Sequence, residues 1–99
     1  MITLEQLRIL YKPQILALAA KYGIENIRVF GSVARGDQDE DSDVDFLCHL
    51  PAEKGVTLWE MAGMWGDLEE VLPVEFDLVA EERLRPEVAA RILQDAVPL

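Results

Sequence analysis

Apolar residues recur at helical spacing in the first 23 residues of the chain, in two stretches separated by a proline. These positions are Leu4, Leu7, Leu10, Ile15, Leu16, Ala19, Ala20 and Tyr22. Thr3 and Gln6 form a capping box, which predicts that a helix begins near Leu4. Pro13 is expected to break or kink this helix, and Gly23 offers a left-handed stop after the second stretch. Two helical pieces are therefore predicted to form the N-terminal cover of the fold.

Two further amphipathic helices are predicted in the second half of the chain. Thr57 and Glu60 form a second capping box, and Pro73 ends the helix that follows it. The apolar stripe of this helix comprises Leu58, Met61, Ala62, Trp65, Leu68 and Leu72. Pro86 occupies a typical first helical position, and the last helix carries Val88, Ala89, Ile92, Leu93 and Ala96.

Three runs rich in β-branched and aromatic residues are predicted to form strands: Ile27–Phe30, Val44–Leu50 and Val74–Ala80. The predicted order is helix, strand, strand, helix, strand, helix, and no linker, repeat or low-complexity tract separates these elements. A chain of 99 residues closes only one hydrophobic core. We therefore expect an α/β (α+β) fold that forms a single domain over residues 1–99.

The charge of the chain is strongly negative, with 19 acidic against 9 basic residues and a net charge of -10. Such a charge opposes binding to a phosphate backbone, so no nucleic-acid target is expected. Six of the nine residues in Asp37–Asp45 are acids, with no Lys or Arg among them, and a strand-like apolar run follows directly. This crowding predicts a cationic ligand, such as a divalent metal or a basic protein partner.

The cysteine content and the lengths of the apolar runs bear on where the protein works. The single cysteine, Cys48, excludes an internal disulfide and is expected to be a small apolar core residue. The sequence contains no secretory signal and no apolar run of membrane-spanning length. We therefore expect a cytoplasmic protein that does not insert into a membrane.

Carboxylates share one face of two predicted strands. Asp43 and Asp45 alternate with apolar residues, so their Cα atoms lie roughly 7 Å apart on the same side of the strand. Their oxygens can converge on one or two hard divalent ions. Asp77 stands mid-strand in the third run and would complete a cluster of three if the two strands are neighbours. The alternative is that Asp77 only faces solvent.

The dipeptide Gly31-Ser32 follows directly after the first predicted strand. At this position backbone N-H groups and a hydroxyl are exposed to an incoming phosphate. The alternative is a tight turn in which Ser32 caps a short helix. The dipeptide alone does not decide between these two interpretations.

The combined pattern resembles the signature of the DNA polymerase β-type nucleotidyltransferase superfamily. Gly31-Ser32 is followed by ten residues, then by Asp43-x-Asp45, and later by another strand-borne aspartate, Asp77. In its smallest form this superfamily includes the minimal nucleotidyltransferases (MNT), many of which are antitoxins paired with HEPN-domain toxins. The resemblance covers most of the chain, through "KYGI", "FGSVARGD", "SDVDFL" and "FDLV".

The resemblance implies a small mixed β-sheet with helices packed on one face, holding a Mg²⁺-bound nucleoside triphosphate across its open face. It implies that Asp43, Asp45 and Asp77 are the catalytic, metal-binding carboxylates, with two Mg²⁺ ions, and that Gly31 and Ser32 bind phosphate. Metal ions suit such a reaction because they neutralise the triphosphate and stabilise the attacking and leaving oxygens.

Two functions are compatible with this resemblance. The first is a Mg²⁺-dependent enzyme that transfers AMP from ATP to a hydroxyl, in this family a tyrosine, of a cognate HEPN-type toxin and so acts as its antitoxin. The second is a non-catalytic acidic antitoxin that masks a basic toxin. The three carboxylates favour the enzyme, because masking does not require them on one sheet face. Transfer to a small molecule fits poorly, since the chain lacks a second domain to shape that pocket. The oligomeric state, homo- or hetero-oligomeric, stays open.

Other residues allow more than one interpretation. Asp37, Asp39, Glu40 and Asp41 match no fixed motif position and are expected to form a solvated loop. Arg35 either reaches a phosphate or forms a structural ion pair. His49 is expected at the surface, outside the site. Trp59 either docks a partner, beside Gly63 and Gly66, or packs under the N-terminal helix.

Overall fold

The computed structural model describes all 99 residues as five α-helices and four strands, with two short 3-10 helices. The helices are α1 (Leu4–Leu10), α2 (Lys12–Tyr22), α3 (Gly31–Arg35), α4 (Leu58–Val71) and α5 (Pro86–Asp95). The strands are β1 (Glu25–Phe30), β2 (Val44–His49), β3 (Phe76–Ala80) and β4 (Val97–Pro98). The 3-10 helices are η1 (Ala52–Lys54) and η2 (Glu81–Arg83).

The helix boundaries follow the capping and breaking residues of the sequence. Thr3 and Thr57 both form complete capping boxes at the starts of α1 and α4. Pro13 lies in the first turn of α2, so the break between the two N-terminal helices is confirmed. Gly23 ends α2 with φ of 73°, a left-handed conformation that glycine adopts without a Cβ penalty.

The sheet is mixed, with strand order β3-β2-β1-β4. β1 runs antiparallel to β2 and β4, whereas β2 and β3 are parallel. The three predicted strands are confirmed with slightly different ends. The sequence analysis missed β4, because a strand of two residues is too short to show a period in the sequence.

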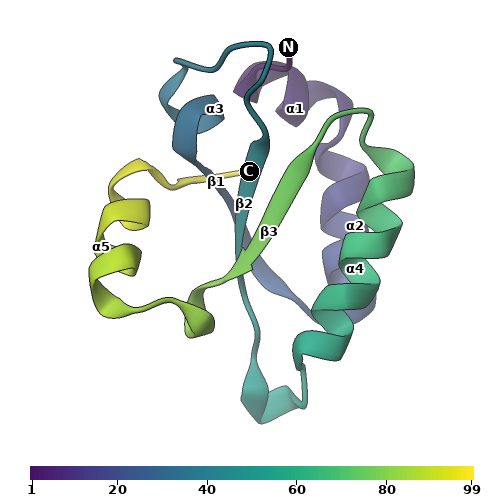
Figure 1. Ribbon diagram of the computed structural model, residues 1–99. Coiled ribbons are helices and arrows are strands. Elements are labelled where there is room, and N and C mark those ends of the chain that lie inside the picture. Colours follow the sequence, from purple (N-terminus) through teal and green to yellow (C-terminus); the bar gives the residue numbers. More distant parts are fainter.

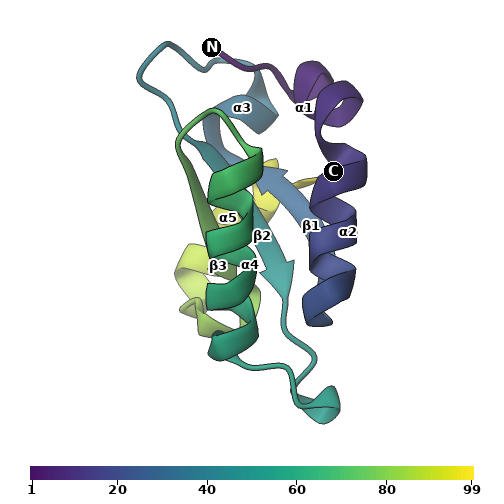
Figure 2. The same ribbon diagram turned by 90° about the vertical axis from the view of Figure 1, so that its right-hand side faces the viewer.

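The helices form a layer on one face of the sheet, with a further helix on the other side. Figure 1 shows α2 and α4 together on one side of the strands and α5 on the opposite side, and Figure 2 shows α2 beside α4 in front of the sheet. The core between sheet and layer includes Leu7, Ile15, Val29, Phe46, Cys48, Met64 and Leu68. Cys48 is fully buried, as predicted. None of the five helices has the length and apolar character required to cross a membrane.

Side chains of β2 alternate between the two faces of the sheet. Phe46 and Cys48 belong to the core, whereas Asp45 and His49 are half-buried on the face away from α2 and α4. Leu47, between them on this second face, is fully buried but lies outside the main core cluster. The second face is therefore covered at its middle and more open towards both ends of β2.

Candidate active site

The parallel pairing of β2 and β3 places Asp45 and Asp77 directly opposite each other. Paired residues on neighbouring strands lie about 5 Å apart and project to the same face of the sheet. Asp45 is half-buried and Asp77 is exposed. Asp77 is therefore exposed to solvent and also lies beside Asp45. The two interpretations of Asp77, a solvent-facing residue and a member of a carboxylate cluster, are compatible.

Asp43 precedes β2 and is exposed, two residues before Asp45. Burial, followed by the negative charges of Asp77 and Asp43, raises the pKa of the Asp45 carboxyl above its ordinary value. Arg35 acts in the opposite direction as the smallest contribution. Asp77 and Asp43 are therefore close enough to Asp45 to disfavour the ionised form of Asp45 in the absence of a cation.

The backbone of Gly31 lies directly against the Asp45 side chain. Gly31 is the first residue of α3, directly after β1, and has φ of 73°. A Cβ atom at this position would lie 2.5 Å from Oδ2 of Asp45. Only glycine fits both the backbone conformation and this approach, so the chain needs a glycine where the family motif has one.

Ser32 lies next to Gly31 in the first turn of α3. The residue that precedes α3 is Phe30, and no side chain caps this helix. The interpretation of Ser32 as a helix cap is therefore wrong. Ser32 is half-buried beside Gly31, close to the position at which β1 pairs Phe30 with Asp45.

Most of the other acids in Asp37–Asp45 belong to an exposed loop. Asp39 accepts a hydrogen bond from the backbone of Asp41 at 2.9 Å, and the Ser42 hydroxyl accepts one from the backbone of Asp39 at 3.0 Å. Asp39, Glu40 and Asp41 are all exposed. These contacts are internal to the loop, in agreement with the expected solvated segment.

Arg35 forms ion pairs with Asp37 at 3.1 Å and with Asp95 at 2.6 Å. The second pair links α3 to α5, so the structure supports the ion-pair interpretation of Arg35. Trp59 is 86% exposed and does not pack under the N-terminal helix. Gly63, on the same side of α4, is covered by the Tyr22 ring, which would lie 2.5 Å from an added Cβ.

The His49 side chain is half-buried and its ring contacts two carboxylates. Its Nδ1 atom contacts Glu82 and lies 3.0 Å from Oε1 of Glu81. Sequence analysis did not single out either glutamate. In the sequence, Glu81 and Glu82 are visible only as an acidic pair directly after the third predicted strand. They lie near His49 because β3 is the neighbour of β2 in the sheet.

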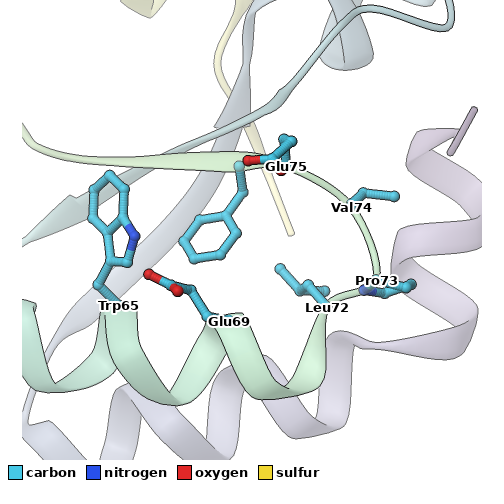
Figure 3. A pocket seen from close by; sticks show the side chains of 7 residues that line it. Trp65, Glu69, Leu72, Pro73, Val74 and Glu75 are labelled. Carbon is cyan, nitrogen blue, oxygen red and sulfur yellow. The ribbon is translucent and has the colours of Figure 1, made fainter.

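The largest pocket lies away from the aspartates. It has a volume of about 500 Å³ and lies between α4 and the chain that leads into β3. Figure 3 shows Trp65 and Glu69 of α4 on one side of it and Glu75 on the other, and Phe76 also lines it. Neither Asp45 nor Asp77 lines this pocket. Asp45 and Asp77 line none of the pockets, whereas Asp43 lines a smaller pocket of about 330 Å³ together with Glu40, Asp41 and Ser42.

The residues on this face fit a hard divalent cation. Carboxylate oxygens are the ligands that Mg²⁺ prefers. Burial, and then the negative charges of Asp77 and Asp43, raise the pKa of the Asp45 carboxyl, and a bound cation would favour its ionised form. The absence of a side chain at Gly31 allows its backbone to lie directly against the Asp45 carboxylate. This fit rests on Asp43, Asp45 and Asp77 together with Gly31.

A small mixed sheet with this helix arrangement defines the class of protein as a polymerase β-type nucleotidyltransferase fold. The nucleotidyltransferase domain family matches residues 14–99, and the chain belongs to this family. The protein is a nucleotidyltransferase. Its family uses a nucleoside triphosphate and a divalent metal.

Three similar proteins support this assignment. Protein adenylyltransferase MntA of Thermococcus cleftensis is 33% identical over 98% of this chain and 96% of its own length. A solved structure of a candidate minimal nucleotidyltransferase is 41% identical, with a TM-score of 0.83, and the match covers 99% of this chain and 97% of that one. A crystal structure of a toxin-antitoxin with AMP-PNP shares the fold, with a TM-score of 0.69 and 18% identity over 90% of this chain and 72% of that one.

Proposed function

We propose that the protein transfers AMP from ATP to a tyrosine hydroxyl of a HEPN-type toxin and so acts as its antitoxin. The observation that carries the proposal is the pairing of Asp45 with Asp77 beside the backbone of Gly31. The similarity to protein adenylyltransferase MntA supports adenylyl transfer to a protein. The likeness of fold to a chain from a toxin-antitoxin structure makes a toxin the natural acceptor to test.

Each candidate residue has a distinct role in this proposal. Asp43 and Asp45 would hold two Mg²⁺ ions, and Asp77 would help to hold one of them. When bound, the ions neutralise the triphosphate and lower the charge cost of transfer. Gly31 and Ser32 present backbone N-H groups and a hydroxyl to the phosphates.

The reaction itself requires little covalent chemistry from the chain. The acceptor hydroxyl loses its proton to solvent water, its oxygen bonds to the α-phosphorus, and pyrophosphate leaves with the electrons of the broken bond. The chain contributes by orienting the triphosphate, because well-oriented reactants need far less activation free energy than free ones. The strand register and the Gly31 contact supply that orientation.

The openness of the site supports a protein acceptor. Small-molecule substrates are usually held in concave pockets, whereas Asp45 and Asp77 lie on an open face. A protein acceptor brings its own surface and closes the site when it docks. An adenylyl group on a toxin tyrosine would add bulk and negative charge where RNA phosphates bind.

The net charge of -10 favours a second candidate function, in which the chain masks a basic toxin without modifying it. The two candidates differ in the covalent product. Incubation with the purified toxin, ATP and Mg²⁺, followed by intact mass spectrometry, should show a gain of one or more AMP units. Asp45→Asn should abolish this gain, and the exposed loop variant Asp41→Asn should retain it.

Neutralisation of the toxin without any mass gain, and undiminished by Asp45→Asn, would establish masking instead of adenylylation. An unmodified and still active toxin would contradict both candidates.

A further inference from the structure

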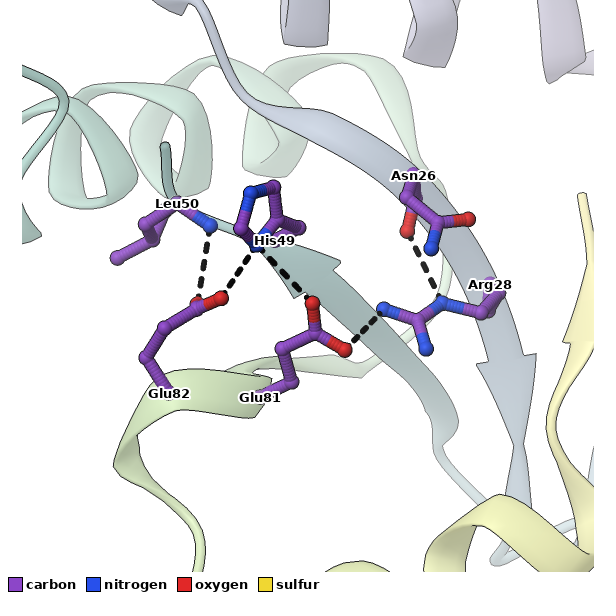
Figure 4. A network of polar contacts seen from close by, with 6 residues as sticks. All are labelled: Asn26, Arg28, His49, Leu50, Glu81 and Glu82. Carbon is purple, nitrogen blue, oxygen red and sulfur yellow. Dashed lines mark hydrogen bonds and ion pairs between the residues drawn. The ribbon is translucent and has the colours of Figure 1, made fainter. Parts of the chain in front are cut away.

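A second polar cluster lies on the same face of the sheet as Asp45, at the other end of β2. The parallel ladder of β2 and β3 ends at the pair of Cys48 and Ala80, and it is followed by His49, the last residue of β2, and by Glu81, the first residue of η2. Glu82 follows in η2. Figure 4 shows both glutamates turned towards the imidazole ring.

The two carboxylates are positioned by other groups of the protein. Arg28 on β1 donates to Oε2 of Glu81 at 2.8 Å, and the backbone N-H of Leu50 donates to Oε1 of Glu82 at 3.0 Å. The remaining oxygens, Oε1 of Glu81 and Oε2 of Glu82, both face Nδ1 of His49. Each carboxylate therefore has one oxygen fixed by the protein and one oxygen directed at the same point.

The donor atoms are close enough for one ion. One nitrogen and two oxygens of the three residues all lie within 4.8 Å of one another. Ligands of a tetrahedral zinc ion lie about 3.4 Å apart, given bond lengths of about 2.1 Å, so modest side-chain movements complete the geometry. The hydrogen bonds from Arg28 and Leu50 match the outer contacts that orient metal-binding carboxylates.

We propose that His49, Glu81 and Glu82 form a structural site for a divalent transition metal, with Zn²⁺ as its preferred ion. An imidazole nitrogen combined with two carboxylates suits Zn²⁺, whereas Mg²⁺ prefers oxygen ligands alone. Cys48 takes no part, because it lies in the core, where burial raises the pKa of its thiol to about 12. Water completes the coordination on the exposed side.

The proposed metal site is separate from the candidate active site, but both sites lie along β2 and β3. His49 and Asp45 are four residues apart on β2, which corresponds to about 13 Å along the strand. A metal at the cluster would bind the downstream ends of β2 and β3 to each other. These are the two strands whose register places Asp45 opposite Asp77, so the metal would stabilise that register.

Calorimetric titration with Zn²⁺ in excess Mg²⁺ tests the proposal, since Mg²⁺ occupies sites made only of oxygen ligands. We expect one Zn²⁺ per chain, and at least tenfold weaker binding in His49→Gln and in Glu82→Gln. Binding should stay within twofold of wild type in Glu70→Gln, an exposed glutamate elsewhere, and in Asp45→Asn, which alters the candidate active site. Circular dichroism establishes that each variant is folded, and Glu81→Gln replaces any variant that is not.

Nitrogen NMR supplies a second readout, because His49 is the only histidine of the chain. Zn²⁺ should move the Nδ1 resonance, and Zn²⁺ should raise the melting temperature of wild type more than that of His49→Gln. Three results would overturn the proposal: no Zn²⁺ binding, binding that His49→Gln leaves unchanged, or a metal bound at Nε2 alone. The cluster would then be only an ion-pair network that holds η2 against β2.

Discussion

Replacing Gly31 by alanine tests whether the approach of this backbone to Asp45 shapes the active site. The φ of 73° costs an alanine about 1–2 kcal/mol. The new methyl group would lie 2.5 Å from Oδ2 of Asp45, well inside ordinary contact. The short Asp45 side chain can escape by leaving its preferred rotamer, which costs about 0.5–1.5 kcal/mol. We therefore expect Gly31→Ala to lower the free energy of unfolding by about 2–3 kcal/mol.

Gly55→Ala is the matched control, because Gly55 has φ of 75° and no atom within 4 Å of an added Cβ. It should show only the backbone cost of about 1–2 kcal/mol. Urea unfolding gives the change in the free energy of unfolding for each variant. The difference between the two changes is the steric cost of the methyl group at Gly31. In an Asp45→Ala background this steric cost should vanish, since the clashing carboxylate is absent.

Activity should separate the two variants more sharply than stability does. Displacement of a reacting group by about 1 Å costs on the order of 100-fold in rate, so Gly31→Ala should lose about that much adenylyl transfer. Gly55→Ala should transfer at the wild-type rate. Equal unfolding free energies for the two variants, together with full transfer by Gly31→Ala, would refute the role assigned to this contact.

Three further predictions concern the carboxylates and their ligands. Asp45→Asn should abolish transfer. Its free energy of unfolding should also increase relative to that of wild type as pH rises from below 3.8, because the raised folded-state pKa makes ionisation of Asp45 destabilising. Urea unfolding at a series of pH values measures this difference. Asp77→Asn should retain part of the triphosphate binding and lose turnover, as measured by calorimetry and a transfer assay. ATP with Mg²⁺ should raise the melting temperature, and Asp43→Asn should reduce the increase.

Local sequence signals predicted most of the fold. Capping boxes at Thr3 and Thr57 and the break at Pro13 depend on neighbouring residues, so they are visible in the sequence. The short strand β4 is not, because its two residues gain their structure only by pairing with Arg28 and Val29 of β1. The same holds for α5, whose position on the opposite side of the sheet is decided by tertiary packing.

The site was predictable in composition but not in arrangement. Alternation along the chain predicts that Asp43 and Asp45 share one face, although β2 itself begins only at Val44. That Asp77 lies opposite Asp45 depends on the strand order, which a spacing of more than thirty residues does not reveal. The close approach of Gly31, the first residue of α3, to Asp45 of β2 likewise depends on tertiary structure, and it was not predicted from the sequence.

The acids at the start of β2 carry a cost that packing does not require. Burial, followed by the negative charges of Asp77 and Asp43, raises the pKa of the Asp45 carboxyl, so an uncharged asparagine would fit the same space without this cost. Arg35, the cation that lowers this pKa, is already paired with two other carboxylates. The charge on this face is thus left for a ligand to neutralise. The uncompensated charge favours the carboxylate face over the larger pocket beside Trp65 as the place where a metal-bound triphosphate binds.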